Sequence, residues 1–257
     1  MLRHLVRPAV VCGLSVLPLL ACGDDPPSGG SSASSGSSSS GTSGQSSSGV
    51  DPGSSSGSVF SSEQRTGIAT YYDATGDGSC SFGTSSDLDV AAFNFPEFAK
   101  SASCGSCIAV SGPKGAVTIR IVDSCPGCEE HHLDLSESAF AKIADPKAGR
   151  VPITYQTVAC KVNGNMAYQF KDGSHEFWTA IQIRNHRIPV TKVEAKKNGV
   201  YAEMKRSDYN YFIDDQGIKD DPIALRITAA DGQVLEDSMP GAKGKAGQEF
   251  PGAVQFK

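Results

Sequence analysis

The chain has 257 residues, a formal net charge of −5 at pH 7 and 8 cysteines. This length corresponds to one or two domains. The mild negative charge argues against a nucleic-acid partner, because nucleic-acid-binding domains carry basic patches.

Residues 1–22 predict a lipoprotein signal peptide. A basic start is followed by an apolar run from 9 to 20, which is too short to span a bilayer as a helix. The run ends in Leu-Leu-Ala-Cys at Cys22, which resembles the bacterial lipobox. We therefore expect lipidation at Cys22 and an exported protein. It would be anchored in the bacterial cell envelope or at the cell surface, or released from there. The alternative is an ordinary signal peptide with a chance cysteine.

Residues 23–62 consist mainly of serine and glycine, so we expect a disordered linker. A coil of about 40 residues has an r.m.s. span of about 35 Å. The linker would tether the folded part, residues 63–257, to its anchor.

Six cysteines follow the linker, all in the first half of the folded part. An even number in an exported chain predicts disulfides. The competing interpretation is a zinc ribbon, because two Cys-x-x-Cys pairs have suitable spacing. We expect disulfides and no metal, but the sequence alone leaves the pairing open. The six are Cys80, Cys104, Cys107, Cys125, Cys128 and Cys160.

Residues 63–161 contain many short strand patterns and one small helix, which predicts a compact barrel. Ser136 can cap the helix, whose apolar positions share one face and which ends before Pro146. The predicted strands are 67–72, 89–93, 108–110, 116–123 and 151–158.

Two aspartates flank the Cys125–Cys128 segment. Asp123 ends a run in which Val117, Ile119 and Ile121 alternate with polar residues. Asp134 stands between two leucines, so it faces a surface or groove if the leucines are core. Either aspartate could instead serve only as a turn or loop residue.

Residues 162–257 lack cysteine and continue with strand patterns separated by turns, which predicts an all-β sandwich. The only tryptophan lies in one of these strands. Alternation from Ile181 and Ile183 places Trp178 on the solvent face and Phe177 on the core face. An exposed tryptophan suggests binding, and aromatic rings suit the apolar faces of sugars. Tyr209 is a further candidate, with ordinary packing as its alternative.

The motifs of the first domain resemble those of expansins in chain order. They are Gly67-Ile-Ala-Thr-Tyr-Tyr, Cys104-Gly-Ser-Cys, Val122-Asp-Ser-Cys-Pro, His132-Leu-Asp-Leu-Ser and Val151-Pro-Ile-Thr-Tyr. The resemblance implies a six-stranded double-psi β-barrel, related to family-45 glycoside hydrolases. Because the cysteines resemble the plant pattern, it also implies the pairs Cys80–Cys104, Cys107–Cys160 and Cys125–Cys128.

The second domain resembles the immunoglobulin-like, carbohydrate-binding sandwich of bacterial expansins. The resemblance implies a binding face of Lys171, Phe177, Trp178 and Tyr209. It conflicts with the alternation at Phe177, unless a bulge or loop lies there. We follow the family at this position.

The resemblance further implies a groove in the barrel formed by Thr70, Tyr71, Asp123 and Asp134. A groove tyrosine of bacterial relatives falls at Cys125 here. His132 stands beside Asp134 without an assigned role. Asp73 occupies the place where the hydrolase family has its base, although it could simply begin a turn.

We therefore expect a monomeric, cofactor-free protein that loosens cell walls without hydrolysis. It would bind cellulose or a related polysaccharide, xyloglucan or peptidoglycan included. One alternative is a weak endo-β-1,4-glucanase, with Asp134 as acid and Asp73 as base. Another is a purely polysaccharide-binding lipoprotein.

Overall fold

The computed structural model describes residues 63–257. The predicted signal peptide, the lipidation at Cys22 and the linker 23–62 lie outside the described residues. None of the helices within residues 63–257 is long and apolar enough to cross a membrane.

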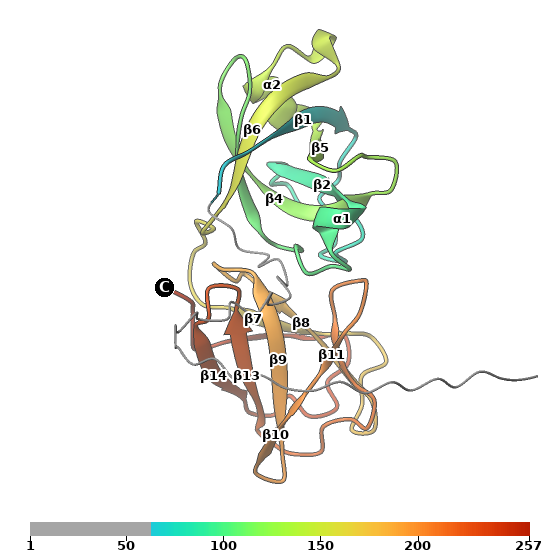
Figure 1. The fold of residues 1–257 in the computed structure, drawn as a ribbon. Helices are drawn as coiled ribbons and strands as arrows, with labels where there is room; N and C mark the ends of the chain where they lie inside the picture. The colour runs from blue at the N-terminus through green and yellow to red at the C-terminus, as the bar shows by residue number, and fades with distance from the viewer. Residues whose placement is uncertain (1–62) are drawn as a thin grey trace, which may run out of the picture. The chain divides into compact units, whose positions relative to one another are not determined.

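The first domain is a closed six-stranded barrel with the order β1-β5-β2-β4-β3-β6 (Figure 1). The neighbours β1 and β5 are parallel, as are β2 and β4, and the other pairs are antiparallel. The strands are β1 (Arg65–Tyr72), β2 (Val90–Asn94), β3 (Cys107–Ser111), β4 (Ala116–Cys125), β5 (His132–Ser136) and β6 (Val151–Val158). The expected barrel is therefore confirmed.

Short helices close the barrel. They are α1 (Phe95–Phe98), α2 (Glu137–Ile143) and the 3-10 helix η1 (Pro146–Ala148). Ser136 caps α2 as predicted, because its side chain accepts a hydrogen bond from the Ala139 N–H at 3.1 Å. The apolar face of α2, with Phe140 and Ile143, is fully buried in the barrel core.

Three disulfides use all six cysteines of the described chain. They join Cys80 to Cys104, Cys107 to Cys160, and Cys125 to Cys128, which are the pairs that the family resemblance implied. Cys104 and Cys107 belong to different disulfides, so the zinc-ribbon alternative is wrong. The first two bridges are buried, whereas the loop between Cys125 and Cys128 is exposed.

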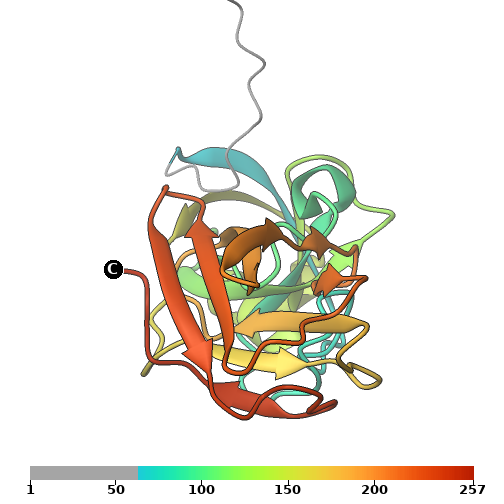
Figure 2. The ribbon, with the colours of Figure 1, turned by 90° about the horizontal axis from the view of Figure 1, so that it is seen from below.

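The second domain is a sandwich of two antiparallel sheets, with orders β10-β9-β13-β14 and β11-β12-β8-β7-β15. Figure 2 shows the domain from below, with the β13–β14 hairpin in orange-red. The strands are β7 (Ala167–Phe170), β8 (Thr179–Arg184), β9 (Val190–Lys197), β10 (Val200–Glu203), β11 (Lys205–Arg206), β12 (Phe212–Asp214), β13 (Ile223–Ala229), β14 (Val234–Met239) and β15 (Glu249–Pro251). The sequence patterns missed β10, β11, β12 and β15, which have two to four residues each.

The two domains are joined by hydrogen bonds between side chains of the sandwich and backbone carbonyls of the barrel. Residues 63–257 belong to one compact unit of the chain. The amides of Gln182 and Asn210 both donate to the Cys80 carbonyl, at 2.9 and 3.2 Å. Arg206 donates to the Ser101 carbonyl at 3.1 Å. Because Gln182 is fully buried on the outer side of β8, the barrel covers this part of the sheet.

His186 is buried at the same junction. Its Nδ1 lies 3.0 Å from the Ile188 carbonyl, to which it donates. A side chain at Gly105 of the barrel would meet the His186 ring at 2.5 Å, so only glycine fits there. Burial, reinforced by the charges of Arg206 and Arg120, lowers the pKa of His186 to about 4. The ring is therefore neutral at pH 7.

We predict that His186 makes the folding stability depend on pH. Its pKa is about 4 in the folded chain and about 6.5 in the unfolded chain, so the unfolded chain binds the proton first. This contribution is complete above pH 6.5 and falls by about 3 kcal/mol as the pH drops to 4. Urea unfolding at several pH values measures it. The His186→Asn variant, which keeps a donor for Ile188, should lack this part of the slope. Identical pH profiles in both proteins would contradict the prediction.

Candidate functional site

A chain of hydrogen bonds crosses β1 and β5 on the outside of the barrel. Thr70 lies opposite Asp134 in the parallel register. The Thr70 hydroxyl donates to Asp134 Oδ1 at 2.5 Å and lies 2.8 Å from His132 Nε2. Since the hydroxyl proton is used by Asp134, His132 Nε2 must carry the proton that Thr70 accepts. Leu133 and Leu135 are fully buried, which confirms that Asp134 faces away from the core.

The protonation state of His132 agrees with this arrangement. Burial lowers the pKa of His132, and the charge of Arg150 lowers it further, while Asp134 opposes the shift. A neutral imidazole with its proton on Nε2 holds Thr70, which in turn orients the Asp134 carboxylate. His132 is therefore part of the site, a role that the family resemblance left unassigned.

Asp123 reaches the same outer face through a β-bulge. In a regular strand it would share the face of Ile119 and Ile121, which are buried in the core. The register of β4 against β2 shifts between Ala91 and Ala92, so Ala92 pairs with Asp123. Ala92 also pairs with Asp134 on its other side. The two aspartates thus flank one residue, and we call the surface between them the groove.

The Asp123 carboxylate holds the loop beside the groove. Its Oδ1 accepts hydrogen bonds from the Ser79 N–H and hydroxyl, both at 2.7 Å, and from the Ser124 N–H at 2.8 Å. A side chain at Gly78 would meet the carboxylate at 2.4 Å, which explains the glycine. Asp123 is therefore a positioning residue for the segment Gly78–Cys80.

Tyr72 is a groove residue that the sequence prediction did not include. Burial raises the pKa of its hydroxyl well above the usual value, and the charges of Asp123 and Asp134 raise it further. Its hydroxyl is buried and has no hydrogen-bond partner within residues 63–257. The period-two spacing from Thr70 could have indicated this position.

Tyr71 and Asp73 stand apart from this cluster. Tyr71 is on the opposite side of β1 from Thr70, and its ring lies 4.9 Å from that of Phe140 in α2. The structure therefore does not bring Tyr71 together with Thr70 and Asp134, and its role in the groove stays a prediction. Asp73 follows the end of β1 and is exposed. Cys125 is in the disulfide with Cys128.

The second domain carries the expected aromatic residues near the start of β8. Phe177 lies in the turn between His175 and Trp178, whose backbones pair with each other. Because the turn precedes Thr179, the first residue of β8, the alternation of the strand does not apply to Phe177. Its side chain is 58% exposed, so the alternation-based prediction that it is core is wrong. Trp178 is half-buried.

A lysine and two tyrosines form a second aromatic cluster on this domain. The Lys171 ammonium lies 5.6 Å from the ring centre of Tyr209 and 5.5 Å from that of Tyr211. The two rings are 5.9 Å apart. Such cation–π contacts fix the rings without covering them fully. Tyr211 is buried, whereas Tyr209 is 38% exposed. We call Lys171, Phe177, Trp178 and Tyr209 the aromatic face.

Comparison with known proteins identifies the family. A family model described as lytic transglycolase matches residues 64–155. Expansin-YoaJ of Bacillus subtilis is 36% identical over 179 residues, which cover 66% of this chain and 76% of that protein. The chain belongs to the expansin family. Expansin-like protein 5 of Dictyostelium discoideum is 31% identical over 67% of this chain and 77% of its own length.

Solved expansin structures share both domains. The apo expansin of Clavibacter michiganensis is 32% identical, with a TM-score of 0.69, and the match covers 76% of this chain and 98% of that one. A mutant of the same expansin, solved in complex with cellohexaose, matches with a TM-score of 0.70. The barrel followed by a sandwich is therefore the expansin fold.

We predict that Thr70 is required to hold the groove together. The Thr70→Val variant leaves both Asp134 and His132 without their shared partner. Leaving such half-buried groups unsatisfied should lower the free energy of unfolding by about 1–3 kcal/mol. Urea unfolding at pH 7 measures this loss. Thr70→Ser, which keeps the hydroxyl, is the matched control. Equal stability of the valine and serine variants would contradict the proposed role.

Proposed function

We propose that this expansin binds cellulose or a related β-glucan and loosens its contacts without hydrolysing it. Three observations support a β-glucan as the bound polymer. They are family membership, the exposed aromatic face and the cellohexaose complex of the Clavibacter relative. Aromatic rings of this kind stack on the apolar faces of sugar rings. Lys171, Phe177, Trp178 and Tyr209 would bind the chain on the sandwich, and Thr70 and Asp134 on the barrel.

We base the proposal of a non-hydrolytic activity on the number of groove carboxylates that are available to a glucan. Glycoside hydrolysis usually needs two carboxyl groups that act as acid and as base or nucleophile. Asp134 has one oxygen bound by Thr70. Asp123 uses its Oδ1 for two donors of Ser79 in the adjacent loop and for the N–H of Ser124 in β4. Because these bonds hold Asp123 against its own chain, we expect Asp134 to be the groove carboxylate that contacts a glucan.

Hydrolysis by Asp134 with Asp73 is the second candidate. Asp73 is exposed directly after β1, the strand that carries Thr70. The barrel also matches a family model whose description names an enzyme. A third candidate is adhesion by the sandwich alone, which the aromatic face would support without the groove. The polymer could be cellulose, xyloglucan or peptidoglycan, and we propose that the protein acts as a monomer.

A pair of variants separates these functions. Asp134→Asn removes the charge but keeps the shape of the side chain. We expect it to abolish extension of heat-killed plant walls while the protein still binds cellulose. Trp178→Ala should weaken cellulose binding at least tenfold, because the sandwich loses an aromatic ring that stacks on a sugar ring. Wall extension under constant load, reducing-sugar release and binding to insoluble cellulose are measured on the same preparations.

Each alternative makes a different prediction in these assays. Sustained sugar release that is abolished by both Asp73→Asn and Asp134→Asn would establish the hydrolase instead. Unchanged activity of Asp134→Asn, with loss of binding only in Trp178→Ala, would establish adhesion. Asp231→Asn, in the exposed β13–β14 turn, is the matched control and should behave as the unmodified protein.

We also propose export and lipid anchoring through Cys22, with residues 23–62 as the tether. Three disulfides in the barrel support an oxidising compartment. The lipobox-like sequence at Cys22 supports the anchor. We predict that Cys22→Ala moves the protein from the membrane fraction to the soluble fraction of the producing cells. Immunoblots of fractionated cells test this. An unchanged membrane fraction would contradict the anchor.

A further inference from the structure

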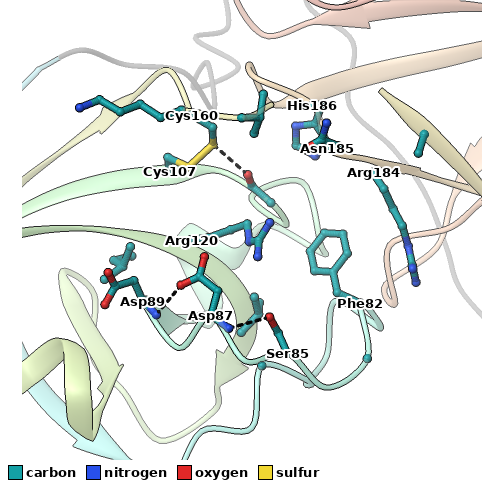
Figure 3. A pocket seen from close by; sticks show the side chains of 18 of the residues that line it. Phe82, Ser85, Asp87, Asp89, Cys107, Arg120, Cys160, Arg184, Asn185 and His186 are labelled. Atoms are coloured by element: carbon teal, nitrogen blue, oxygen red, sulfur yellow. Dashed lines mark hydrogen bonds between the residues drawn. A yellow bond between two sulfur atoms is a disulfide. The ribbon is translucent and has the colours of Figure 1, made fainter. Parts of the chain in front are cut away.

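A cavity of about 530 Å³ lies at the junction of the barrel and the sandwich, outside the groove. Its volume is within the range of small-molecule sites. The barrel contributes the loop 82–89 and part of β4, and the sandwich contributes residues 184–186 and Glu249. Figure 3 shows Phe82, Arg120 and Arg184 around this space. Neither Thr70 nor Asp134 lines it.

Some of the charges in the cavity wall are already paired. Asp89 is bound by Lys142 at 2.5 Å. Arg184 is bound by Glu249 at 3.1 Å and donates to Gln182 at 2.6 Å. Each of these ion pairs is neutral. The net charge of the cavity wall therefore depends on Asp87, Arg120 and Lys161.

Arg120 differs from the other two charged groups without an ion pair, Asp87 and Lys161, because one of its donors is buried. Its Nε is buried, yet this atom has no hydrogen-bond partner within residues 63–257. The side chain is half-buried on β4 and extends toward Phe82 in Figure 3. Leaving a buried donor of a charged group unsatisfied is costly. A guanidinium matches a planar carboxylate with two parallel hydrogen bonds, which makes an anion the fitting partner.

The remaining lining suits a sugar that carries this carboxylate. Phe82 offers an aromatic ring for an apolar sugar face. Thr118 and Asp87 offer oxygen atoms to sugar hydroxyls, and Asp87 is held in place by the Asp89 N–H at 3.1 Å. A ligand with a carboxylate for Arg120 and hydroxyls for Thr118 and Asp87 is a sugar acid. The class that fits is a uronic acid.

The loop that borders the cavity also borders the groove. Ser79 binds the groove residue Asp123, and the same loop continues through Phe82 into the cavity wall. The groove and the cavity therefore share one loop. We propose that the cavity binds a uronate branch of a matrix polysaccharide, with Arg120 as the partner of its carboxylate. This goes beyond the proposed function, because it adds a matrix polysaccharide with uronate branches to the polymers named there.

Binding of defined oligosaccharides tests this site in the intact protein. The probes are a glucuronoyl-substituted xylo-oligosaccharide, its carboxyl methyl ester, the unsubstituted oligosaccharide and free glucuronate, all measured by calorimetry. We expect the substituted acid to bind at least tenfold more tightly than the ester or the unsubstituted chain. Arg120→Gln should remove this preference, and raised salt should weaken it. Arg187→Gln, an exposed arginine outside the cavity wall, should keep it.

Several outcomes would overturn the proposal. Equal affinity of the unmodified protein for acid and ester is one, and it does not depend on the folding of any variant. Full retention of the preference in Arg120→Gln is another. Equal affinity for free glucuronate and the substituted oligosaccharide would show a site for the monosaccharide, not for a branch. Cellulose binding by Arg120→Gln should be unchanged, and failure of the unmodified protein to bind cellulose counts against the proposed function alone.

Discussion

The fold depends on how the segment Gly78–Cys80 is held. The Cys80–Cys104 disulfide fixes it to the barrel, and the Cys80 N–H donates to the Val122 carbonyl at 3.0 Å. Ser79 binds the Asp123 carboxylate, while the Cys80 carbonyl accepts the amides of Gln182 and Asn210 from the sandwich. Three consecutive residues thus join the groove, the barrel core and the second domain. The groove and the second domain are therefore both bonded to this one segment.

The two aspartates of the groove have different roles. Asp123 stabilises the loop and is occupied by it, whereas Asp134 is oriented by Thr70 and His132. Burial, reinforced by the charges of both aspartates, raises the pKa of the Tyr72 hydroxyl. Asp134 is thus the groove carboxylate that is not tied to the loop. This difference supports the proposed contact with sugar hydroxyls, because hydrolysis usually needs two carboxyl groups.

Much of this architecture could be predicted from local sequence. Alternating β-branched residues predicted most strands of the barrel, and Ser136 predicted the start of α2, because both signals depend on neighbours in the chain. The position of Asp123 could not be predicted, since a bulge is defined by the register with a partner strand. Phe177 was ambiguous for a related reason: alternation cannot tell where a turn ends and β8 begins. The disulfide pairs followed from the family resemblance, not from the spacing of the cysteines.

The extra residue at Val122 has a consequence for engineering this fold. Regular pairing of β4 with Val122 retained, and therefore without the bulge, would turn the Asp123 carboxylate into the apolar interior. An attempt to transplant the groove onto another barrel would therefore have to copy the bulge, and not only the two acids. The sequence spacing of Asp123 and Asp134 places both acids on the outer face only when the bulge is present.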